Sequence, residues 1–197
     1  MLFDRSKGVP AEVSKVDLTS WYNKLNDQEK VKLGRYISGS DTSSKAAFAV
    51  SVMKKANEDH SFSISAVTGE NILASGPKDA DRFDVLEEII LAYYGMSKYD
   101  ECLESCESGL KLVPKLLNDI KARNGGVVPE RLNCRNYKIN VLVGIRYDYD
   151  AGDRALEEFH KLGILSAEDM EFRKRSHRIY RLQKSFDGIF SVKIKDV

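Results

Sequence analysis

The chain has 197 residues, of which 42% are hydrophobic and 31% charged, and its 31 basic and 30 acidic side chains leave a net charge of +1. This composition is ordinary for a soluble globular protein, and four prolines argue against disorder or long linkers. The balanced charge gives no whole-chain argument for binding nucleic acid or a membrane. No apolar run suits a signal peptide or a membrane span, and the chain has three cysteines, so we expect a cytoplasmic protein with reduced thiols.

The first part of the chain predicts three helices. A short one begins at Asp17 as its N-cap and ends at Asn26. Asn26 and Glu29 have capping-box spacing, which predicts the start of a second helix. A third helix begins at Asp41 or Thr42 as its cap. Its apolar residues recur at helical spacing and are Ala46, Ala49, Val50 and Met53.

Residues 60–77 follow a different pattern. Apolar residues alternate with serines, and a Thr-Gly-Glu-Asn run at 68–71 suits a turn, which predicts a small β element over 61–75. A helix over the same residues is the alternative. The tail also alternates, which predicts a short strand over 190–195, and an isolated strand would need a partner.

A strong helical signal begins at Lys78. An apolar stripe runs along this helix, with Glu87 at its edge and Glu88 facing away. After a break at 95–97 a second helix follows, and Pro114 predicts that it ends there and that another helix starts. The stripe of the first helix consists of Phe83, Leu86, Ile89, Ile90 and Tyr93.

The last third predicts three further helices. Pro129 opens the first of them, and a turn over 148–153 leads to the second, which ends at Gly163. Ser166 and Asp169 form a capping-box-like pair at the start of the third.

The hairpin over residues 83–114 has large apolar residues and a tyrosine on its first helix, small residues on its second, and a proline at its end. This pattern resembles a tetratricopeptide repeat (TPR), although the family usually has Gly where this chain has Ile90. The matching slots hold Leu86, Ile89, Tyr93, Cys102, Cys106, Gly109 and Pro114.

Two further segments, 27–58 and 137–163, resemble the same repeat more faintly. In the slot where the family has an apolar residue followed by Gly, these segments have Leu33-Gly34 and Val143-Gly144. The three matches lie 56 and 54 residues apart at Leu33, Ile89 and Val143, whereas a TPR repeats every ~34 residues. Segments 59–78 and 115–130 therefore look inserted.

The expected fold is a mainly all-α stack of antiparallel helical hairpins with a C-terminal capping helix. It forms a single domain over 1–197, or alternatively an N-terminal helical part over 1–77 and a TPR-like part over 78–197.

The resemblance implies a non-catalytic module for protein–protein interaction or scaffolding, without a cofactor. In TPR proteins the first helix of each hairpin lines the concave, peptide-binding surface. Acidic side chains fill this face here, which suits a basic or mixed partner segment. A homo-oligomer is a further alternative, and so is an ordinary solvated acidic face. The expected partner-binding residues are Asp84, Glu87, Glu88, Leu91 and Tyr94.

A basic helix over 172–184 supports a second hypothesis. Phe172, Ile179, Leu182 and Phe186 form one stripe, and basic residues occupy the opposite arc. That arc is either a solvated face or a site for phosphates, an acidic peptide or anionic lipid, and its strongest use would be nucleic-acid binding. Arg175 falls within the apolar stripe and needs a carboxylate or a subunit interface. The candidate patch is Arg173, Lys174, Arg178, Arg181 and Lys184.

Other patterns carry little chemistry. Cys102 and Cys106 lie on one helix face without a second ligand pair, so packing is favoured over a metal or redox role. The calcium-like run at 148–153 lacks the required Gly and Glu, and 39–45 lacks the P-loop ending. An enzyme of unrecognised type is the weakest hypothesis.

Overall fold

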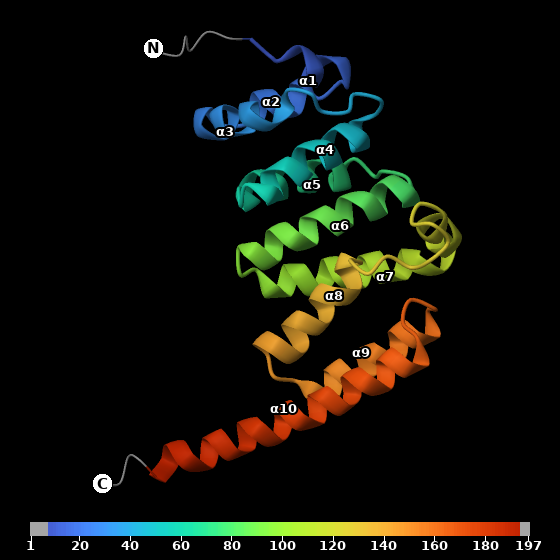
Figure 1. Ribbon diagram of the computed structural model, residues 1–197. Coiled ribbons are helices and arrows are strands. Elements are labelled where there is room, and N and C mark those ends of the chain that lie inside the picture. Colours follow the sequence, from blue (N-terminus) through green and yellow to red (C-terminus); the bar gives the residue numbers. More distant parts are fainter. Residues whose placement is uncertain (1–7, 194–197) are drawn as a thin grey trace. The chain divides into compact units, whose positions relative to one another are not determined.

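The computed structural model describes the backbone of residues 8–193 and the side chains of residues 8–185 (Figure 1). Throughout this part of the chain the regular elements are helices, which confirms the all-α expectation. The predicted β element over 61–75 is wrong, because Phe62–Ala74 forms helix α5. The predicted strand over 190–195 is wrong for 190–193, which belong to a helix, and residues 194 and 195 lie outside the described residues.

The chain forms two compact units, which we describe separately. The first ends at Leu116 and the second begins at Leu117. This boundary falls inside helix α7, which spans Tyr99–Ala122. The expected single domain, or its division at residue 77, remains a prediction.

The first unit opens with α1 (Ala11–Lys15), α2 (Thr19–Lys24) and α3 (Asp27–Ile37). Asp17 was predicted to cap this second helix, and that is wrong, because α2 begins after Leu18 and no side chain caps it. Asp17 has a positive φ of 54°, and its carboxylate accepts a 2.8 Å hydrogen bond from Lys45 Nζ. The predicted capping box is confirmed, since the Asn26 side chain accepts from the Glu29 N–H at 2.9 Å and the Asn26 N–H donates to Glu29 Oε2 at 2.8 Å.

Three helices form the centre of the first unit: α4 (Lys45–Glu58), α5 (Phe62–Ala74) and α6 (Asp79–Gly95). Each packs against the other two. Helix α4 is capped by Ser44, whose hydroxyl accepts from the Ala47 N–H at 3.0 Å, and not by the predicted residues at 41–42. Short connections make α4, α5 and α6 successively antiparallel (Figure 1).

Close helix approach explains why residues 61–75 are helical despite their alternating pattern. Gly69, in the expected turn, is buried in α5, and a Cβ there would lie 2.7 Å from Met53 Cε and 3.0 Å from Ile89 Cδ1. These contacts come from α4 and α6. The small side chains of α5 therefore fit between two helices, which a local alternation cannot reveal.

Helices α6 and α7 form an antiparallel hairpin. The Cys102 thiol donates to the Ile90 carbonyl oxygen at 3.7 Å, which marks a close approach of the two helices. The predicted break at Pro114 is wrong, because α7 continues through it to Ala122. Pro114 is exposed, while Val113 and Leu116 beside it are buried, so packing holds the helix together across a residue that disfavours it.

The second unit contains α8 (Asn133–Ile139), the π-helical segment η1 (Asn140–Ile145), α9 (Tyr149–Lys161) and α10 (Ala167–Lys193). A helix was predicted to start at Pro129. Helix α8 begins four residues later, at Asn133.

Two caps define the long helices of the second unit. Residues 149–153, predicted as a turn, form the first turn of α9, capped by Asp148, which accepts from the Ala151 N–H at 2.8 Å. The predicted capping pair at the start of α10 is confirmed, since Ser166 Oγ accepts from the Asp169 N–H at 3.0 Å. Of the helices that the structure describes, none is both long enough and apolar enough to cross a lipid bilayer.

Candidate functional site

A groove lies between α4 and α6 in the first unit. Its volume is about 320 Å³. The segment before α4 contributes Asp41, and α6 contributes Asp81 and Asp84. The remaining lining comes from one face of α4 and consists of Ala46, Ala47, Val50, Ser51 and Lys54.

Small side chains on α4 make the groove. Ala46 and Ala47 both line the groove, and longer side chains at these positions would fill part of it. Val50 adds a half-buried apolar surface one turn further along. We call its apolar lining, which is Ala46, Ala47 and Val50, the floor, and its charged side chains, which are Asp41, Lys54, Asp81 and Asp84, the rim.

The rim of the groove is mainly acidic. Asp41, Asp81 and Asp84 oppose a single exposed ammonium group, that of Lys54. The backbone N–H of Ser43 donates to Asp41 Oδ1 at 2.8 Å, and this hydrogen bond holds the pKa of the Asp41 carboxyl below its usual range. An apolar floor with a carboxylate rim suits a partner side chain that has a long apolar stem and a cationic end.

The side chains of the expected partner-binding face of α6 are only partly exposed to solvent. Asp84 lines the groove, and Glu87, Leu91 and Tyr94 are half-buried. Glu88 was predicted to be exposed to a partner on this face, and that is wrong, because its side chain is buried.

Glu88 is held by Asn57 of α4. The Asn57 amide donates to the Glu88 carbonyl oxygen at 3.0 Å and to its Oε2 at 3.1 Å. Burial raises the pKa of the Glu88 carboxyl, and the Asn57 hydrogen bond partly opposes that rise. Glu88 therefore links α4 to α6 and is not placed to meet a partner.

The α4 side of this groove was not predicted. The sequence pattern placed α4 as the second helix of a hairpin with α3, because a β element was predicted where α5 lies. The available signal was Ala46-Ala47 followed by Val50, which repeats small or apolar residues on one side of α4. Only the packing of α4 against α6 makes that side of α4 part of a groove.

Three of the five basic residues predicted on α10 have partners within the chain. Lys174 Nζ lies 2.7 Å from Glu157 Oε1, and Arg181 Nη2 lies 2.6 Å from Asp150 Oδ1. The Lys184 ammonium lies over the Tyr147 ring. Of the other two predicted cations, Arg173 is half-buried and Arg178 is exposed. The predicted patch is therefore interspersed with carboxylates, which reduces its attraction for phosphates.

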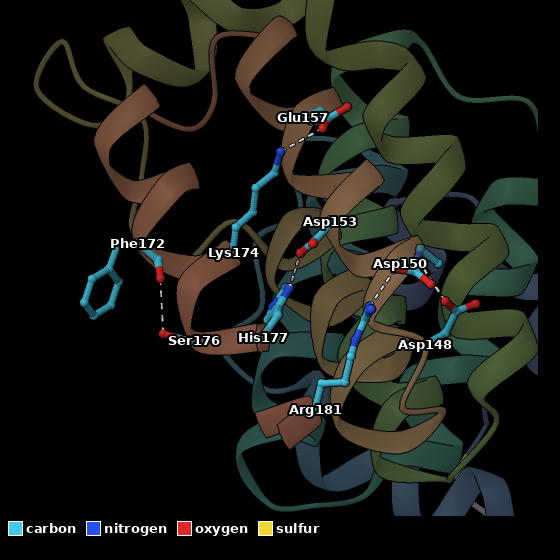
Figure 2. A network of polar contacts seen from close by, with 10 residues as sticks. Asp148, Asp150, Asp153, Glu157, Phe172, Lys174, Ser176, His177 and Arg181 are labelled. Carbon is cyan, nitrogen blue, oxygen red and sulfur yellow. Dashed lines mark hydrogen bonds and ion pairs between the residues drawn. The ribbon is translucent and has the colours of Figure 1, made fainter. Parts of the chain in front are cut away.

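The ion pairs of Lys174 and Arg181 belong to a row of polar contacts between α9 and α10, which we call the polar ladder (Figure 2). Between its two ion pairs, His177 Nδ1 donates to Asp153 Oδ1 at 2.7 Å. The His177 side chain is buried, and its ring lies 3.3 Å from where a Cβ on Gly152 would be. The ladder pairs, in chain order on α9, are Asp150–Arg181, Asp153–His177 and Glu157–Lys174.

The apolar stripe of α10 faces the opposite way. Phe172 is 69% exposed, Ile179 is 55% exposed and Leu182 is 60% exposed. Figure 2 shows Phe172 directed away from α9. The predicted division of α10 into two faces is therefore present, but the polar face packs on α9 and the apolar face meets solvent.

A second, more open pocket of about 400 Å³ lies where α9 begins. Tyr147 and Tyr149 contribute to it, and the Arg181 guanidinium lies over the Tyr149 ring, 5.6 Å from its centre. The rings of Tyr147 and Tyr149 are thus covered by Lys184 and Arg181 of the same chain.

The three cysteines form no disulfide and are buried, as the packing interpretation predicts. Within the part of the chain that the structure describes, no group of three or more metal-binding side chains comes together.

Comparisons with protein-family models, with curated proteins and with solved structures find no match. The class of this protein therefore rests on its own architecture, which is all-α over the residues that the structure describes.

Proposed function

We propose that this protein is a non-catalytic protein-interaction module of TPR-like type, and that the α4–α6 groove binds a basic segment of a partner protein. The observation that carries the proposal is the groove itself, with an apolar floor and three carboxylates at its rim. A lysine or arginine side chain of the partner would lay its stem on the alanines and its charge beside Asp81 and Asp84.

The order of the helices supports the TPR-like part of the proposal. Lys45 and Asp79, the first residues of α4 and α6, are 34 positions apart, which matches the TPR period of ~34 residues. With α5 as a helix, the repeats α4–α5 and α6–α7 follow each other directly. The spacing of 56 residues came from pairing α4 with α3.

This arrangement also agrees with the face on which the family binds peptides. Helices α4 and α6 would be the first helices of successive hairpins, and the groove lies between them. Asp84 belongs both to the predicted partner-binding residues and to the groove.

The test is a binding measurement with labelled peptides of equal length that are basic, neutral or acidic. We expect the basic peptide to bind the wild-type protein best. The double substitution Asp81→Lys and Asp84→Lys should weaken that binding by about tenfold or more, because it replaces attraction by repulsion at the rim. Fluorescence anisotropy gives the affinities.

A matched control is available on α7. Asp81 and Asp84 are the third and sixth residues of α6, and Glu101 and Glu104 are the third and sixth residues of α7. Glu101→Lys with Glu104→Lys changes the net charge and the helix dipole interaction equally, but outside the groove. Equal weakening by both double variants would show that only overall charge matters, and undiminished binding by the groove variant would refute the proposed site.

A further inference from the structure

The outward stripe of α10, formed by Phe172, Ile179 and Leu182, has the spacing of a coiled-coil seam. Phe172 and Ile179 are seven residues apart, and Leu182 follows three residues later, as for the a and d positions of a heptad. In the sequence, apolar residues recur in the same heptad at 186 and 189. All three stripe side chains are more than half exposed.

The ladder with α9 fixes which side of α10 faces outward. Lys174, His177 and Arg181 contact α9 and lie on the side of the helix opposite the stripe. Because three polar contacts, including the buried His177, hold this orientation, rotating the helix to bury the stripe on α9 would break them all.

The length of α10 also exceeds what α9 can cover. Helix α10 has 27 residues and α9 has 13, which correspond to about 40 Å and about 20 Å at 1.5 Å per residue. A heptad seam that runs along a helix of this length is typical of pairing with another long helix.

We propose that this partner is α10 of a second copy of the chain, paired in the antiparallel direction through the outward stripe. Such a seam is complementary to itself across a two-fold axis. Arg175 occupies a d position and is exposed, so a parallel pair would bring two Arg175 side chains together.

The antiparallel pair avoids that repulsion. If it is centred between Ile179 and Leu182, each Ile179 meets Leu182 of the other copy. The two Arg175 residues then lie eleven positions apart, or about 16 Å along the axis. That separation exceeds the Debye length of about 8 Å at physiological salt.

Analytical ultracentrifugation of the full chain tests the proposal. We expect a dimer that weakens on the order of a hundredfold in Ile179→Asp, because each dimer would bury the introduced carboxylate twice. Tyr180→Asp is the matched control, since Tyr180 is adjacent and equally exposed at 54% but lies outside the a and d positions. It should remain dimeric. Circular dichroism should show the same helix content for both variants at a concentration low enough for each to be monomeric, because both side chains are exposed in the single chain.

Orientation is tested by mixing Arg178→Cys chains with Ser185→Cys chains and adding a short bismaleimide. Both positions are exposed, and the native cysteines are buried. Antiparallel pairing predicts crosslinks mainly between the two kinds of chain. A monomeric wild-type protein, a dimer that survives both Ile179→Asp and Leu182→Asp, or crosslinks mainly between identical chains would each overturn the proposal.

Discussion

Glu88 shows how one buried residue changes the interpretation of a whole helix face. On a helical wheel it lies beside Glu87 and outside the main apolar stripe. In the structure the Asn57 amide binds it, so its carboxylate joins two helices at the cost of partial desolvation. The proposed partner site therefore uses the carboxylates that line the groove and not that of Glu88.

Glu88→Gln should stabilise the protein at neutral pH. Burial raises the folded-state pKa of Glu88 above its ordinary value of 4.5, so the folded state binds more protons than the unfolded state between these two values. Stability from this group is therefore lost as the pH rises through that window. Glutamine keeps an acceptor for Asn57 and removes the charge.

The measurement is urea unfolding of both proteins as a function of pH. The stabilising difference should be largest at neutral pH and should vanish below pH 4.5, where Glu88 is protonated in both states. Glu104→Gln, on an exposed position of α7, is the control. A difference that stays constant with pH would contradict the role assigned to the Glu88 charge.

At the scale of elements, α10 illustrates that amphipathicity predicts two faces but not their directions. Burial of an apolar stripe normally decides which side of a helix faces its neighbour. Here the carboxylates of α9 decide instead, because Asp150, Asp153 and Glu157 match the spacing of the basic residues on α10. The stripe is then left for another surface.

His177→Ala should destabilise the second unit by about 1–3 kcal/mol. The substitution removes a buried ring and leaves the Asp153 carboxylate without that hydrogen bond. Arg178→Ala on the next, exposed position should change stability by less than about 0.5 kcal/mol. Thermal or urea unfolding of the two variants measures the difference, and equal effects would show that the ladder does not hold α10.

At the scale of the whole molecule, two different surfaces are proposed for two different partners. The groove in the first unit would bind by charge, and the outward stripe in the second unit would bind by apolar contact. Their dependence on salt separates them, because screening weakens exposed charge pairs and leaves apolar burial largely unchanged.

Raising the ionic strength should therefore weaken binding of the basic peptide and leave the dimer intact. The Debye length falls from about 30 Å at 0.01 M salt to about 3 Å at 1 M. Peptide affinity by anisotropy and the dimer by ultracentrifugation, measured in the same buffers, give the comparison. A dimer that dissociates as salt rises would point to ion pairs, and not the stripe, as its main contact.

Much of the fold could be predicted from local signals. The capping pairs Asn26–Glu29 and Ser166–Asp169 and the stop near Gly163 locate helix ends, because caps act within one turn. The errors lie where neighbours override local preference. Gly69 is at a helix crossing and not in a turn, and α7 continues through Pro114 because adjacent residues are buried.

Half of the candidate groove could be predicted in the same way. Asp84 follows from the periodicity of α6, whereas the alanines of α4 gain their meaning only when α5 brings α4 against α6. The side of a groove contributed by another helix has no local signature, since it depends on which helices pair.

The sequence by itself determined the all-α class, most helix positions and the two-faced character of α10, because periodicity and capping act over a few residues. The tertiary structure decided which faces are buried. It turned Glu88 inward, brought α4 and α6 together around the groove, and directed the stripe of α10 to solvent. These outcomes depend on contacts between residues far apart in the chain, whose energies exceed the local preferences that a sequence pattern records.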